Sequence, residues 1–116
     1  MPFRSADAAL PLTPISFEIL LALTQGDRHG YAILQQVEAR TAGLLPLRTG
    51  TLYRALARME EAGVIDLVDG PADDERRRYY RITPKGREIA RGEAKRLEDQ
   101  VAAARARKLL SGSNQP

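Results

Sequence analysis

The chain has 116 residues, a length typical of one domain, and its 18 Lys and Arg against 15 Asp and Glu give a net charge of +3 at pH 7. It has no cysteine and one histidine, which excludes disulfide scaffolds, thiolate zinc sites and cysteine nucleophiles, and leaves no usual histidine metal site. Neither a membrane-spanning apolar run nor a signal-peptide pattern is visible, so we expect a cytoplasmic protein without metal or other cofactor.

Positive charge gathers in places along the chain despite the small net charge. An acidic stretch at residues 73–75 is followed directly by Arg76, Arg77 and Arg78, and residues 84–116 hold eight basic against four acidic groups. Local arginine clusters of this kind suit an anionic polymer bound on one face, and they suit ordinary solvated surface charge equally well.

Caps and breakers predict two helices in the first third of the chain. Thr13 can cap the first helix, Pro14 suits its first position, and Gly26 suits its end. Its apolar face comprises Ile15, Ile19, Ala22 and Leu23. The second helix is predicted over residues 29–42, with His29 as a capping or packing residue rather than a ligand or a catalytic base.

A third helix is predicted over residues 50–62, capped by Thr49 and stopped by Gly63. One face is apolar and comprises Leu52, Leu56 and Met59, while the opposite face comprises Thr51, Arg54, Arg58 and Glu61. Three helices of this length with short links predict a tri-helical core.

A β-hairpin with a long polar tip is predicted next, from strands at residues 64–68 and 77–82. On the second strand Tyr80 and Ile82 share one face, and Arg77, Tyr79 and Arg81 share the other. Thr83 and Pro84 then open a long helix that is predicted to reach about residue 110.

The long helix carries an apolar stripe at spacings of four and three, formed by Ala90, Ala94, Leu97, Val101 and Ala104. Such a stripe can fold back on its own domain or meet a second copy, and its position after the hairpin favours a dimer. We therefore divide the chain into a flexible segment (1–10), a winged helix-turn-helix domain (11–83), a dimerisation helix (84–110) and a disordered tail (111–116).

The order helix, helix, helix, hairpin, long helix predicts a mainly α fold with a small β-hairpin, the winged helix-turn-helix, whose third helix enters the DNA major groove. The predicted DNA-binding residues are Tyr31, Thr49, Gly50, Thr51, Tyr53, Arg54, Arg58, Arg76, Arg77 and Arg78. Arginine suits guanine because its planar fork can donate two parallel hydrogen bonds.

Several of these residues also have a structural interpretation. Tyr53 can touch a phosphate or pack against the hairpin, and Tyr31 can contact the DNA backbone or lie at the edge of the core. The hairpin forms the wing of this fold. Its arginines Arg76, Arg77 and Arg78 can contact a DNA groove or balance the acidic residues before them. Alternation of Arg77, Tyr79 and Arg81 also suits single-stranded nucleic acid, although one outward tyrosine is a thin stacking platform.

Four motifs, in this order, resemble the PadR family of transcriptional regulators over roughly residues 12–90. They are His29 with the run 30–33, the run 50–56, Glu60 with 63–65, and the run 77–83 with Gly86. The resemblance implies a winged helix-turn-helix repressor, dimeric through its C-terminal helix and often responsive to small hydrophobic or phenolic compounds. The single C-terminal helix is similar to the short subgroup, and Arg54 stands where many members have proline.

The predicted function is therefore a homodimeric regulator, favoured as a repressor, that binds a pseudo-palindromic double-stranded DNA operator. A small hydrophobic effector would bind where Leu12 and Ile15 of one chain meet Leu97 and Val101 of the other, unless the alanines of the stripe let the helices close that space. The alternative is a winged-helix protein-interaction module. An enzyme is disfavoured by the missing cysteines, the lone histidine and the lack of a phosphate-cradling glycine loop.

Overall fold

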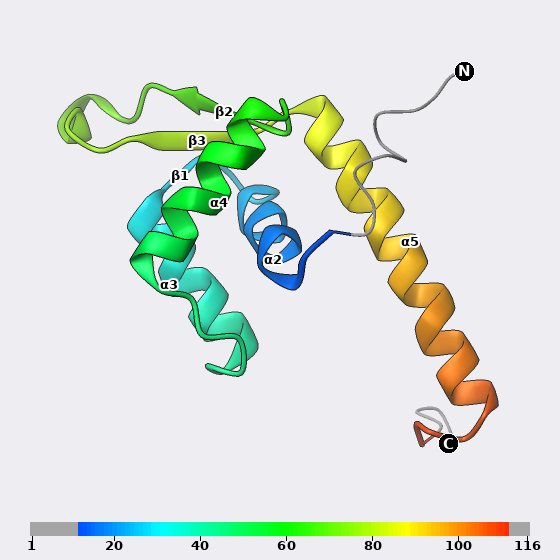
Figure 1. Cartoon of the computed structure of the whole chain (residues 1–116). Coiled ribbons are helices and arrows are strands. Elements are labelled where there is room, and N and C mark those ends of the chain that lie inside the picture. Colours follow the sequence, from blue (N-terminus) through cyan, green and yellow to red (C-terminus); the bar gives the residue numbers. More distant parts are fainter. Residues whose placement is uncertain (1–11, 112–116) are drawn as a thin grey trace.

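The computed structural model describes residues 12–111, as a three-helix body with a small sheet on one side and a long C-terminal helix (Figure 1). The predicted N-terminal segment (1–10) and residues 112–116 of the predicted tail lie outside the described residues. No helix of the described part is long and apolar enough to cross a membrane.

The first described helix, α2 (Pro14–Leu23), begins where the sequence predicts it. The Thr13 hydroxyl accepts a hydrogen bond from the backbone N–H of Ser16 at 3.0 Å, and Pro14 occupies the first turn. The side chains of Ile19, Leu20 and Leu23 are fully buried, so α2 forms the centre of the core.

A two-residue strand, β1 (Arg28–His29), precedes α3 (Gly30–Thr41). The His29 ring caps α3, because Nδ1 accepts a hydrogen bond from the backbone N–H of Ala32 at 3.1 Å. The capping role of His29 is thereby confirmed. The sequence does not predict β1, because two residues are too short to show an alternating pattern.

The third helix of the body, α4 (Thr49–Glu61), buries Leu52, Leu56 and Met59 as predicted. The prediction that Thr49 caps this helix is wrong. Arg48 occupies the cap position with an extended backbone, its carbonyl accepts from the N–H of Leu52 at 2.9 Å, and no side chain caps the helix. Thr49 is the first helical residue, one position too late for its hydroxyl to act as the cap.

The sheet is antiparallel with strand order β1-β3-β2, where β2 spans Ile65–Val68 and β3 spans Tyr79–Ile82. A short 3-10 turn, η1 (Ala72–Asp74), lies in the tip of the hairpin. Tyr80 and Ile82, predicted to share one face, are both buried, so β3 faces the helices with alternate residues. Arg81, on the other face, donates to both carboxylate oxygens of Asp27 at 3.1 and 2.8 Å.

The last helix, α5 (Pro84–Ala106), has 23 residues and is capped by the Thr83 hydroxyl. Its first half packs on the core through Ile89 and Ala90 and buries Glu93, which accepts from the backbone N–H of Leu12 at 3.3 Å. Its second half extends away from the body (Figure 1). The helix ends four residues before the predicted boundary, because Arg107 and Lys108 leave the helical conformation.

Candidate nucleic-acid interface

The outer face of α4 presents polar side chains from its first turn onward. Arg54 and Arg58 are exposed, and the Arg54 guanidinium lies over the start of the helix, with Nη2 at 3.5 Å from the Thr51 hydroxyl. A Cβ on Gly50 would lie 3.4 Å from Arg54 Nη1, so this arginine folds back closely over the first turn. Thr49, Gly50, Thr51 and Arg54 therefore form one polar group, with Arg58 one turn further along.

Tyr53 joins this face of α4 to the beginning of α3. Its ring lies against Gly30, where a Cβ would come within 2.7 Å of Tyr53 Cζ, closer than real Cβ contacts allow. A larger residue at position 30 would therefore have to displace the Tyr53 ring. Tyr53 therefore packs against α3, while 44% of its surface stays exposed.

A hollow of about 420 Å³ opens beside Tyr53 and gathers residues from three parts of the chain. Its lining residues are His29, Gly30, Tyr31, Tyr53, Arg76, Arg77 and Arg78. Three guanidinium groups and no carboxylate line it, so the hollow is strongly positive. The tertiary structure thus brings the predicted tyrosines of α3 and α4 together with the predicted arginines of the hairpin.

The wing is held in shape by Tyr79, at the start of β3. Its hydroxyl donates to Asp74 at 2.7 Å, a hydrogen bond that raises the pKa of the Tyr79 phenol, and its ring packs against Gly70 on the opposite arm. Asp74 also lies 3.7 Å from Arg77 Nε. Within residues 12–111, no carboxylate lies within ion-pair distance of Arg76 or Arg78.

His29 belongs to this site, although the sequence analysis placed it only as a cap. Its Nε2 lies 2.6 Å from Arg77 Nη1, and its ring meets Tyr79 edge-on with centroids 5.3 Å apart. Burial and the positive charge of Arg77 lower the pKa of His29, and Asp74 opposes them more weakly. The signal available in the sequence was its position directly before the Gly30-Tyr31 motif.

The residues predicted for dimerisation differ in their surroundings. Ala90 is buried in the core of its own chain, whereas Ala94 and Val101 are exposed, and Leu97 and Ala104 are half-buried. Leu12 and Ile15, predicted for the effector pocket, pack partly buried against the core.

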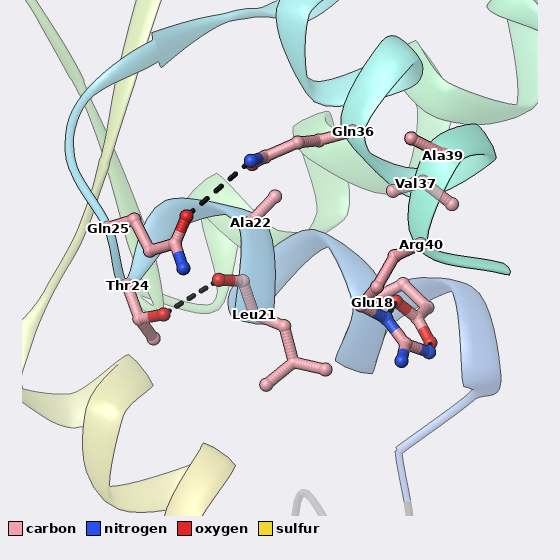
Figure 2. A pocket seen from close by; sticks show the side chains of 9 residues that line it. All are labelled: Glu18, Leu21, Ala22, Thr24, Gln25, Gln36, Val37, Ala39 and Arg40. Atoms are coloured by element: carbon pink, nitrogen blue, oxygen red, sulfur yellow. Dashed lines mark hydrogen bonds and ion pairs between the residues drawn. The ribbon is translucent and has the colours of Figure 1, made fainter.

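A separate cavity of about 450 Å³ lies between α2, the turn after it, and α3 (Figure 2). At one end Arg40 donates to both carboxylate oxygens of the buried Glu18 and so fastens α3 to α2. At the other end the side-chain amide of Gln36 approaches that of Gln25 at 3.5 Å. None of the predicted DNA-binding or effector residues lines this cavity.

The winged helix-turn-helix class of protein is defined by a tri-helical body, an outward-facing third helix and a small sheet whose hairpin, here β2 and β3, forms the wing. The chain belongs to the PadR-like family of transcriptional regulators, whose family model matches residues 19–91. The resemblance stated from the sequence motifs is thereby confirmed, and members of this family are transcriptional regulators rather than enzymes.

Two solved structures show the same fold. A transcriptional regulator from Clostridium thermocellum is 33% identical with a TM-score of 0.69, and the match covers 79% of this chain and 87% of that one. A PadR family transcription regulator from Clostridium difficile is 25% identical with a TM-score of 0.71, covering 81% of this chain and 97% of that one.

Curated relatives are longer than the matched region. "Uncharacterized protein X" from Lysinibacillus sphaericus is 37% identical over 70 residues, which cover 60% of this chain and 64% of that protein. The match to a 37.1 kDa protein of a Streptomyces fradiae transposon covers 21% of it. The chain thus spans less than two thirds of the length of both relatives.

Proposed function

We propose that the protein binds double-stranded DNA sequence-specifically, with α4 in the major groove and the wing on the flanking backbone. The observation that carries this proposal is that the outer face of α4 and the positive hollow meet at Tyr53. Tyr53 lies on α4, beside the exposed Arg54, and also lines the hollow that holds Arg76, Arg77 and Arg78. A duplex that contacts the outer face of α4 therefore meets the positive hollow at the same time.

The candidate DNA-binding residues form three groups, according to the part of the DNA that each would contact. Arg54 and Arg58 are exposed along α4 and have the fork geometry that reads guanine O6 and N7. Thr49, Gly50 and Thr51 lie in the first turn, where free backbone N–H groups favour phosphate. Tyr31, Tyr53 and the wing arginines take backbone or minor-groove contacts, which position the protein without reading sequence.

Selection of bound sequences from random duplex DNA with the purified full chain tests this function. We expect one enriched motif arranged as an inverted repeat, with half-sites about one helical turn apart. If no sequence is enriched and retention does not fall with salt, the DNA-binding proposal is wrong and the surface serves a protein partner, because phosphate contacts always make binding salt-dependent.

We propose further that the protein acts as a homodimer joined by the second half of α5. In support, Val101 is 42% exposed on a part of α5 that extends away from the body (Figure 1). Residues Ala94, Leu97, Val101 and Ala104 continue the stripe there. Two copies joined along this stripe would present two α4 helices to a pseudo-palindromic operator.

We propose that this dimer is a repressor located in the cytoplasm, released from DNA by a small hydrophobic compound. Within one chain the backbone N–H of Leu12 donates to Glu93, one turn before Leu97 on α5, so Leu12 lies beside the start of the stripe that the proposed dimer covers. In that dimer Leu12 and Ile15 of one chain would meet Leu97 and Val101 of the other. A ligand releases DNA only if it binds the DNA-free arrangement better. Titration of planar aromatic compounds against the protein–DNA complex, with Leu97→Trp as a fluorescent reporter, tests this. The effector proposal falls if no compound quenches the reporter or releases the DNA.

A further inference from the structure

The His29 ring faces two hydrogen-bond donors at once. Nδ1 lies 3.1 Å from the backbone nitrogen of Ala32, and Nε2 lies 2.6 Å from Arg77 Nη1. A neutral imidazole has one accepting and one donating nitrogen, while a backbone N–H and a guanidinium only donate. The ring can therefore accept from one of these two partners, and its other nitrogen carries a hydrogen.

The accepting nitrogen of His29 bonds to the backbone N–H of Ala32 in preference to Arg77. It lies in the first turn of α3, where backbone N–H groups have no partner within the helix, and His29 is the cap that satisfies it. Arg77 has an alternative, because its side chain is 54% exposed to water and lies 3.7 Å from Asp74. Nδ1 therefore accepts from Ala32, and Nε2 carries the hydrogen.

With this tautomer, an N–H of His29 and an N–H of Arg77 point at each other across 2.6 Å without an acceptor between them. The groups that face the ring are Arg77 from the loop before β3, Asp74 from η1 and Tyr79 from β3. Asp74 already accepts from the Tyr79 hydroxyl at 2.7 Å. The Arg77 side chain is 54% exposed and can swing away from the ring, so that an anionic oxygen from outside the chain could enter between the two groups, accept from both and remove their repulsion.

The surroundings of this pair suit a phosphate. The hollow that contains His29 and Arg77 is also lined by Arg76, Arg78, Tyr31 and Tyr53, which supply further donors and positive charge. We propose that His29 and Arg77 together bind one phosphate of the DNA backbone, with a single oxygen accepting from His29 Nε2–H and from the Arg77 guanidinium. This inference rests on the proposed DNA binding and assigns His29 a direct contact, with the α3 cap fixing its ring in the donating tautomer.

Phosphate neutralisation in the duplex tests the contact at one position. In the selected duplex, each phosphate near the wing is replaced in turn by an uncharged methylphosphonate, and affinity is measured for wild type, His29→Asn and Arg77→Ala. Asparagine keeps a capping oxygen for Ala32 but is too short to place a donor beside Arg77. Arg105→Ala, an exposed arginine in the last turn of α5 and outside the hollow, serves as the matched control.

We expect one phosphate per half-site whose replacement weakens wild-type binding about tenfold, the value of a hydrogen bond to a charged group. The same replacement should cost less than about threefold in His29→Asn and Arg77→Ala, and close to the wild-type factor in Arg105→Ala. Equal sensitivity of that phosphate in wild type and His29→Asn overturns the inference and leaves DNA binding intact. A failure of wild type to bind any duplex overturns both.

The ring nitrogens give a readout that a merely structural cap would not move. In nitrogen-15 spectra of the free chain we expect Nδ1 without and Nε2 with a hydrogen. Addition of the duplex should shift the Nε2 signal and leave Nδ1 in place. A hydrogen on Nδ1 in the free protein, or an unchanged Nε2 signal in the complex, overturns the inference.

Discussion

The ring of Tyr53 on α4 lies directly against the Cα of Gly30, at the first residue of α3. This contact joins the two helices that a helix-turn-helix must hold at a fixed angle, and it forms one wall of the positive hollow. The position of the hollow relative to α4 therefore depends on a residue without a side chain.

Gly30→Ala should displace Tyr53, because the added Cβ would lie 2.7 Å from Tyr53 Cζ. We expect weaker DNA binding and a lower melting temperature, with a loss of stability below the roughly 1–3 kcal/mol that overpacking costs in a closed core, because Tyr53 is 44% exposed and can move outward. Thermal unfolding and binding titration measure the two effects. In a Tyr53→Ala background the same substitution should cost much less, and an equal cost in both backgrounds would show that the contact is unimportant.

Arg54→Ala and Arg58→Ala should each weaken binding to the selected operator without lowering stability, because both side chains are exposed on the face of α4 opposite its buried residues. Loss of a bidentate base contact costs about 1–3 kcal/mol. Arg105→Ala, an exposed arginine in the last turn of α5, is the matched control. Operator affinity equal to wild type at the same salt would remove that arginine from the group that reads bases.

Replacement of Arg76, Arg77 and Arg78 by alanine should flatten the dependence of DNA affinity on salt. Each phosphate contact contributes about 0.9 to the slope of log affinity against log salt, through counterion release. Affinity is measured for wild type and the triple variant over a series of salt concentrations. A slope identical to wild type would mean that the wing does not touch the DNA.

Folding stability should fall as the pH drops through about 6.5, the ordinary histidine pKa. Burial first, and then Arg77, lower the pKa of His29 in the folded chain, so the unfolded chain binds the proton more readily. Unfolding by denaturant at pH 7.5 and pH 5.5 measures this loss. His29→Asn, which keeps a cap but does not titrate, should lose less stability over this interval, and an equal loss in both proteins would contradict the prediction.

Val101→Asp should turn the proposed dimer into a monomer while the domain stays folded, because Val101 lies in the projecting half of α5 and is 42% exposed in the single chain. Light scattering reports the mass, and helical content reports the fold. Ala102→Asp places the same charge one residue off the stripe and should remain dimeric. A dimer with aspartate at position 101 would place the interface elsewhere.

The sequence by itself determined the class of fold. Thr13 with Pro14 and Thr83 with Pro84 mark two helix starts, and these caps act within three residues of their own position. The residue periods then predicted the apolar face of α4 and the common face of Tyr80 and Ile82 on β3, since period follows from backbone geometry alone, and both faces are buried. At α4 the preference for threonine as a cap gave the wrong residue by one position, because Arg48 and not Thr49 occupies the cap position.

Only the tertiary structure decided how the site is assembled. His29 and Arg77 are 48 positions apart. The sequence predicted that His29 could cap α3, but no local pattern predicts that the same ring also meets Arg77 of the wing. Strand β1 exists only because β3 pairs with it, and Ala90 is buried because α5 crosses the core at that turn. Local rules act over three or four residues through backbone hydrogen bonds, whereas these contacts depend on the space left when distant elements pack together.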